Sequence, residues 1–167
     1  MSNNFIIMIK RIVSLTLILA VVTIHAAAQA GLQINQLFDG RFHNASNATE
    51  IVVTGEKARE IGLNVYHSLS VVNDQKAGQQ IESLVTKDGA KAVNKEVEYR
   101  NGRIFYGFYT LTPLSLKSRK KRQLSPINRF ILYLNQNLQR QKPKDTVILI
   151  YMESEQNGSY VKSMIGK

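Results

Sequence analysis

The stretch VNKEVEYRNGRIFYGFYTL, residues 93–111, decides the fold because it contains two strand-like halves around a tight turn. Asn101-Gly102 is the strongest short-range signal for a two-residue β-hairpin, since both residues tolerate the positive φ angles of that turn. In the first half, Val97 and Tyr99 alternate with charged residues, as in a half-exposed strand. The second half is aromatic on both faces, which is typical of a central strand. The stretch therefore predicts an antiparallel hairpin.

The chain before this hairpin predicts two further strands and three helical segments. Residues 50–54 and 63–72 have the β-branched composition or the period-two alternation of strands. Residues 32–38 and 56–61 suit short helices, and Gly62 is placed to end the second one. Asp74 is expected to cap a longer helix that runs to about residue 87. Its apolar side chains recur at helical spacing, at Ala77, Ile81, Leu84 and Val85.

The chain after the hairpin predicts one helix and two strands. Ser125-Pro126 suits a helix start, with proline in the first helical position. Apolar residues at 127, 130, 131, 134 and 138 have a helical spacing, so we expect a helix from 125 to about 142, although the compact run FILYL also suits a strand. Residues 146–152 and 159–165 are expected to be strands.

Together these elements predict a single α+β domain. We expect a mostly antiparallel sheet of about five to six strands, with two to three helices packed on one face. No internal repeat, linker or low-complexity segment divides residues 29–167.

The first 28 residues have the features of a secretory signal peptide. Lys10 and Arg11 precede an apolar run at residues 12–24, and Ala26-Ala27-Ala28 supplies a small-residue cleavage site. Thirteen apolar residues are fewer than the roughly 20 that a membrane-spanning helix needs. We expect cleavage between Ala28 and Gln29, no transmembrane segment in the mature chain, and a periplasmic or outer-membrane-associated location. A retained N-terminal anchor is the alternative.

Motifs for enzymatic, metal or cofactor chemistry are missing from the sequence. There is no cysteine, which excludes thiol catalysis and Cys-ligated metals. The three histidines form no metal-ligand spacing, and His67 is expected to be a satisfied core residue. No nucleophile-elbow, phosphate-loop or dinucleotide-binding motif occurs. We therefore predict no catalytic, metal or cofactor-binding residue, and a non-enzymatic protein.

Positive charge is concentrated in residues 117–144, which contain nine Lys or Arg and no Asp or Glu. Five of these charges fall within the basic segment, defined as residues 117–122. Such a run is either a solvated loop or a contact for a polyanion. The candidate anion-contact residues are Lys117, Arg119, Lys120, Lys121, Arg122 and Arg129.

The chemistry of the partner follows from the export signal. Export disfavours intracellular nucleic acid, and the segment lacks the aromatic platforms of nucleic-acid-binding modules. The expected anions are therefore anionic lipid, lipopolysaccharide or acidic glycan. Two alternatives stay open: an envelope enzyme of unrecognised type, and a subunit of an envelope protein complex that binds another protein.

A set of short motifs is spread along the whole predicted mature chain. The motifs are Glu50-x-Val52 with Gly55, Gly62-Leu63-x-x-Tyr66, Lys95-Glu96-Val97-x-Tyr99 before Gly102, Tyr106-x-x-Tyr109-x-Leu111, Asn128-Arg129-Phe130-x-x-Tyr133-Leu134-Asn135, and Ile150-Tyr151-Met152-Glu153. Together they resemble a family of small exported proteins of unknown function from Bacteroides and relatives. The resemblance implies a cell-envelope location and no activity, so it assigns no catalytic residue.

Overall fold

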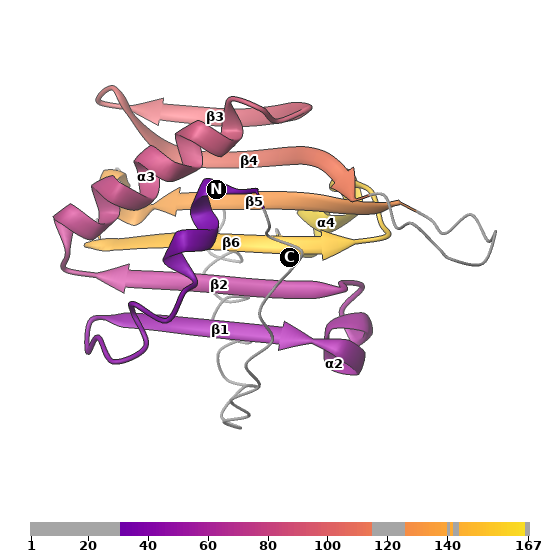
Figure 1. Ribbon diagram of the computed structural model, residues 1–167. Coiled ribbons are helices and arrows are strands. Elements are labelled where there is room, and N and C mark those ends of the chain that lie inside the picture. Colours follow the sequence, from indigo (N-terminus) through magenta and orange to yellow (C-terminus); the bar gives the residue numbers. More distant parts are fainter. Residues whose placement is uncertain (1–30, 115–125, 140, 142–143, 166–167) are drawn as a thin grey trace.

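The computed structural model describes residues 31–114, 126–139, 141 and 144–165, and its centre is a six-stranded antiparallel sheet (Figure 1). The strand order across the sheet is β1-β2-β6-β5-β4-β3. The strands are β1 (Ala48–Thr54), β2 (Val65–Val72), β3 (Asn94–Arg100), β4 (Arg103–Leu114), β5 (Ile127–Asn135) and β6 (Thr146–Ser154). The helices are η2 (Gln33–Leu37), α2 (Gly55–Glu60), α3 (Gln75–Gly89), η3 (Gln136–Leu138) and α4 (Gly158–Ile165). The predicted single α+β domain is confirmed.

The hairpin predicted around Asn101-Gly102 is present as β3 and β4. Asn101 and Gly102 have φ angles of 50° and 74°, as a two-residue turn between antiparallel strands requires. Arg100 and Arg103 are the first pair of the ladder, and a bulge lies between Glu98 and Tyr99. The local turn chemistry therefore sets the register of this edge of the sheet.

The predicted helix over residues 125–142 is wrong, because residues 127–135 form the strand β5. β5 lies between β4 and β6, so both of its edges are hydrogen-bonded, and its residues are buried in the clusters on both faces of the sheet. Leu132 and Tyr133, which the helical spacing left out, are as buried as Phe130 and Ile131. A run that is apolar at every position suits a central strand better than an amphipathic helix, whose outer face would be polar. Of the five apolar residues that suggested the helix, Leu138 alone is helical, within the short η3 (Gln136–Leu138).

The predicted strand over residues 159–165 is also wrong, because this segment is the helix α4. The side-chain oxygen of Asn157 accepts a hydrogen bond from the backbone N–H of Tyr160 at 3.0 Å, which caps the helix start. Val161 and Ile165, four residues apart, are the buried residues of α4. A spacing of four places them on one helix face, whereas a strand would also bury Ser163 between them, and Ser163 is exposed.

Helices cover both faces of the sheet, so the expectation that they pack on one face is wrong. α3 and η2 cover the face that we call the α3 face, where Ile131, Tyr133 and Leu149 are buried. Ala58 of α2 and Val161 of α4 belong to the hydrophobic cluster of the opposite face, the α4 face. Figure 1 shows α3 in front of the strands and α4 behind them. Both faces of the central strands are therefore buried.

The long helix α3 forms as predicted and lies close to the sheet. Its N-cap Asp74 accepts a hydrogen bond from the backbone N–H of Ala77 at 2.9 Å. At its other end, a Cβ atom added to Gly89 would clash with the ring of Tyr109. A Cβ added to Gly107, two residues before Tyr109 on β4, would lie 2.6 Å from the same ring. The two glycines thus make room for Tyr109 between helix and sheet.

Candidate functional site

The basic segment belongs to the connection between β4 and β5. Its residues Lys117, Arg119, Lys120, Lys121 and Arg122 lie outside the described residues. The described chain stops at Leu114 and resumes at Pro126, and Leu114 pairs with Ile127 at the end of the β4–β5 ladder. Both ends of the connection are therefore held at the same end of the sheet.

The described residues carry no net charge. They contain twelve Lys or Arg and twelve Asp or Glu, so their balance is 12 − 12 = 0, whereas the full chain has 22 − 12 = +10. Four of the twelve cations are in ion pairs, for example Arg103 with Glu82 and Lys162 with Glu96. Half of the excess of ten positive charges lies in the basic segment.

Arg129, the sixth candidate anion-contact residue, lies on β5 and not on a helix. Its Nε donates a hydrogen bond to the backbone oxygen of Thr112 on β4, at 2.9 Å. Glu153 is its direct neighbour on β6. The charge of Arg129 also lowers the pKa of Glu153, against the effect of burial. The structure therefore gives Arg129 partners within the sheet, at the end where the β4–β5 connection is attached.

A row of polar side chains crosses the α3 face next to Arg129. We call Arg129, Glu153, Tyr151, His67 and Glu50 the polar row. Glu153 and Tyr151 come from β6, His67 from β2 and Glu50 from β1. His67 and Tyr151 are cross-strand neighbours, as are Arg129 and Glu153. Four adjacent strands thus bring five polar groups onto one face.

Histidine 67 is engaged on two sides. Its Nε2 lies 2.6 Å from Oε1 of Glu50, and the Phe38 ring lies 3.8 Å from the imidazole, centroid to centroid. The His67 side chain is buried. This environment agrees with the predicted role of His67 as a satisfied core residue.

The tyrosine–glutamate pair of the row is buried as well. The hydroxyl of Tyr151 donates a hydrogen bond to Oε1 of Glu153 at 2.6 Å. Burial raises the pKa of the Glu153 carboxyl, and the Tyr151 hydrogen bond and the Arg129 charge oppose that rise. Burial, with the neighbouring Glu153, also raises the pKa of Tyr151. A buried carboxyl with a raised pKa is a group that can serve as a general acid.

The surroundings of Glu153 give this chemistry little support. Glu153 is 5% exposed and is held by Tyr151 and Arg129. Neither of the two surface hollows described below is lined by a residue of the polar row. The row is best explained as buried and half-buried polar groups that satisfy one another within the sheet.

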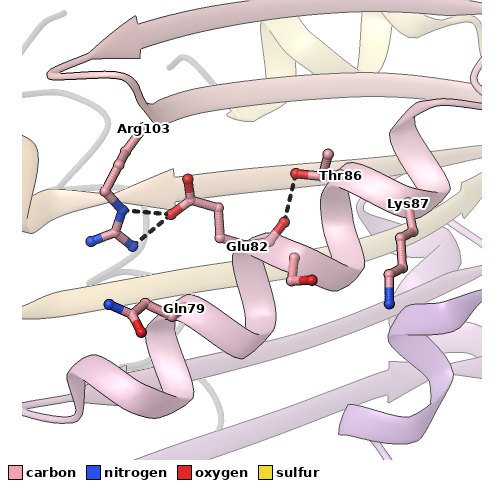
Figure 2. Close-up of a pocket in the computed structure, with 6 residues that line it drawn as sticks. Gln79, Glu82, Thr86, Lys87 and Arg103 are labelled. Carbon is pink, nitrogen blue, oxygen red and sulfur yellow. Dashed lines mark hydrogen bonds and ion pairs between the residues drawn. The ribbon is translucent and has the colours of Figure 1, made fainter.

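The larger hollow, of about 420 Å³, lies along α3 beside the start of β4 (Figure 2). Its only acidic lining residue is Glu82, whose Oε2 accepts hydrogen bonds from Arg103 at 2.6 and 3.1 Å. Oε1 of Glu82 accepts from the backbone N–H of Ile104, and Tyr133 also approaches this carboxylate. Figure 2 shows Lys87 pointing away from the Glu82–Arg103 pair. Glu82 therefore joins α3 to the sheet.

The second hollow, of about 240 Å³, lies between β3, β4 and the start of α4. Both carboxylate oxygens of Glu96 contact Nζ of Lys162, which closes an ion pair across the hollow. Phe108 forms part of its apolar wall. Each hollow thus contains one carboxylate already paired with a cation, where acid–base catalysis by two carboxylates would need two free ones.

The described residues contain neither a cluster of metal-ligating side chains nor a helix that could cross a membrane. In residues 31–114, 126–139, 141 and 144–165, no group of three or more His, Asp or Glu side chains is arranged to hold a metal ion. Over the same ranges, no helix has the length and apolar character to cross a membrane.

The sequence did not predict the polar row, because its residues are far apart along the chain. Glu50 and His67 are 17 residues apart, and Arg129 and Glu153 are further apart still. Only the pairing of β1 with β2, of β2 with β6 and of β5 with β6 brings them together. With residues 125–142 assigned to a helix, no sequence signal placed Arg129 opposite Glu153.

Comparison with known proteins places the chain in a family without assigning an activity. No curated protein and no solved structure shows a significant match to the chain. A family model, described as a family of unknown function, matches residues 21–165, which include all of the described fold. The chain therefore belongs to this family of unknown function, DUF6108.

Proposed function

We propose that the protein is an exported, non-enzymatic binding protein of the cell envelope that contacts an anionic partner through the basic segment. The partner would be anionic lipid, lipopolysaccharide or acidic glycan. Export is supported by the signal-like residues 1–28, and an envelope location by the resemblance to exported proteins from Bacteroides and relatives.

The distribution of charge is the observation that carries the proposal. The described fold is neutral, while five positive charges occupy six residues of one connection between neighbouring strands. Like charges so close together repel one another unless an anion is near. An anionic membrane surface attracts each nearby Lys or Arg by roughly 1 kcal/mol, so five of them suffice for reversible binding.

The non-enzymatic part is supported by the two hollows. Glu82 and Glu96 are each paired with a cation, and neither hollow reaches His67 or Glu153. An anion bound through the basic segment would need no such cavity, because a run of cations can bind a charged surface directly.

Vesicle binding across a salt series tests the proposal. The variant replaces Lys117, Arg119, Lys120, Lys121 and Arg122 with glutamine. The matched control removes the same charge from five exposed cations elsewhere, by changing Lys57, Arg59, Lys76, Lys87 and Lys91 to glutamine. We expect the wild type and the control to sediment with phosphatidylglycerol vesicles at low salt and to dissociate as salt rises. The basic-segment variant should stay in solution.

The outcomes distinguish binding by the basic segment from non-specific attraction by positive charge. They also distinguish between the possible anionic partners. Equal loss in both variants would contradict a role for the segment, and equal binding to uncharged vesicles would contradict the electrostatic mechanism. Competition by lipopolysaccharide, or by an acidic polysaccharide, identifies which source binds best. The mass of the protein recovered from the periplasm and membranes tests export, since cleavage as predicted starts the chain at Gln29.

A further inference from the structure

The two outer strands of the sheet differ in how they are protected against pairing with another chain. An exposed strand edge presents unpaired backbone groups, and natural proteins guard such edges with charges, bulges or prolines. β3 has these features: Lys95, Glu96, Glu98 and Arg100 are charged, and the bulge after Glu98 interrupts its ladder.

The other outer strand, β1, has a single charged residue, Glu50, and neither a proline nor a bulge. Its sequence ATEIVVT contains no Lys, Arg or Pro, and its seven pairs with β2 run without a register shift. Five of its seven residues are β-branched, which favours strand pairing. Val52, at its middle, is 50% exposed. β1 therefore has the composition of a strand that is paired on both sides, yet β2 is its sole strand neighbour in the described sheet.

The register of β1 shows which backbone groups face outward. The backbone N–H of Val72 donates to the oxygen of Asn47 at 2.8 Å, which fixes the phase of the ladder. In antiparallel pairs, every second residue exchanges hydrogen bonds with the neighbouring strand. Thr49, Ile51 and Val53 thus face β2, whereas the N–H and C=O groups of Glu50 and Val52 point away from it.

We propose that β1 pairs with β1 of a second copy of this chain, in an antiparallel ladder centred on Ile51. In this register, Glu50 lies opposite the partner's Val52, and Val52 lies opposite the partner's Glu50. All of the outward backbone groups of these two residues are then hydrogen-bonded. A two-fold axis through the ladder makes the interface self-complementary, and the two sheets become one of twelve strands.

Charge and packing both favour this register. Glu50 is the only charged residue of β1, and the pairing never places it opposite its own copy. On the α4 face, Ile51 meets the partner's Ile51, and Val53 meets the partner's Thr49. Ile51 and Val53 already pack against the α4-face core, so pairing extends that core across the interface. The proposal does not depend on the anionic partner of the basic segment.

Single cysteines test the register, because the chain has no cysteine of its own. The protein is produced from its full sequence, so that any processing is retained. Ile51 would be a non-hydrogen-bonded pair with Cα atoms about 4.5 Å apart, within disulfide range. Ile51→Cys should form a disulfide-linked dimer under mild oxidation. Val53→Cys, on the same face, is the control, since its two copies would lie about 13 Å apart along the strands.

Solution mass gives the second test. By light scattering, the wild type should be a dimer, and Val52→Lys should be a monomer with unchanged circular dichroism, because Val52 is half-exposed. Val93→Lys, at a position 62% exposed and outside the strand, should remain a dimer. A monomeric wild type would overturn the proposal. Equal cross-linking of Ile51→Cys and Val53→Cys would overturn it as well.

Discussion

The carboxylate of Asp88 lies 2.9 Å from the backbone nitrogen of Ile34, so that the last turn of α3 caps a helix that begins more than 50 residues earlier. Its other oxygen accepts a hydrogen bond from the N–H of Gln33, also at 2.9 Å. The residue in the N-cap position of η2, Leu32, has no side chain that could accept these bonds. Asp88 therefore supplies the cap from outside and fixes η2 onto the α3 face.

Removing this cap should loosen the N-terminal segment. Asp88 is buried, so Asp88→Ala leaves two N–H groups without their acceptors and should cost about 2–3 kcal/mol of unfolding free energy. Asp88→Asn keeps one acceptor oxygen and should cost less. Urea unfolding followed by circular dichroism measures both. If the two variants are as stable as the wild type, the cap contributes nothing.

The contact between Gly107 and Tyr109 predicts a steric effect that can be relieved. Gly107→Ala places a methyl group against the buried Tyr109 ring and should destabilise the fold by about 1–3 kcal/mol. In a Tyr109→Leu background, the same alanine has space and should cost much less. A double-mutant cycle from thermal or urea unfolding measures the coupling. Additive effects would show that the ring and the glycine do not interact.

Glu82, in the hollow beside α3, should stabilise the fold by linking α3 to the sheet. Glu82→Ala removes the acceptor for Arg103, for the Ile104 N–H and for the Tyr133 hydroxyl, and should cost about 2–3 kcal/mol. Lys87→Ala changes an exposed residue on the rim of the same hollow and should stay within about 0.5 kcal/mol of the wild type. Similar losses of unfolding free energy in the two variants would contradict this role of Glu82.

The raised pKa of Glu153 predicts that its contribution to the unfolding free energy falls as pH rises. Because burial raises its pKa in the folded state, the folded protein binds a proton here more tightly than the unfolded chain does. Its contribution to stability is therefore present at low pH and is lost as pH rises from about 4.5 through the raised pKa. Glu153→Gln should remove this loss, so that the variant gains stability relative to the wild type as pH increases.

Unfolding in urea from pH 4 to 8 measures the difference between the two proteins. Glu155→Gln, at an exposed position just beyond β6, is the control for a changed carboxyl at the same end of the sheet. A wild type that gains stability relative to Glu153→Gln as pH rises would contradict the raised pKa.

Local chemistry made part of this fold predictable. The Asn101-Gly102 turn, the Asp74 cap and the apolar spacing of α3 all act within a few residues, and the structure contains each of them. The α+β class followed from these elements. Segments whose conformation depends on distant neighbours were assigned wrongly or missed.

β5 shows why. Its apolar residues fit a helical spacing. Only its pairing with β4 and β6 at both edges, and the clusters that bury both of its faces, decide for a strand. α4 shows the opposite error, because a segment predicted to be a strand forms a helix. Its packing on the α4 face of the sheet cannot be inferred from the local sequence. The polar row needed the same long-range pairing. The residues of the basic segment lie outside the described residues, and their role remains a prediction.

The pairing of β2 with β6 also determines the order in which this protein can fold. β1 and β2 form one ribbon, β3 to β6 form another, and β2–β6 is the ladder that joins them. Synthesis completes β2 at Val72, long before β6 begins at Thr146. The β1–β2 ribbon therefore has both outer edges unpaired until β6, near the end of the chain, has been synthesised. A nascent chain that stalls in this interval exposes the unpaired edges of β1 and β2, which can aggregate. We therefore expect a chaperone to protect this ribbon more than the rest of the chain.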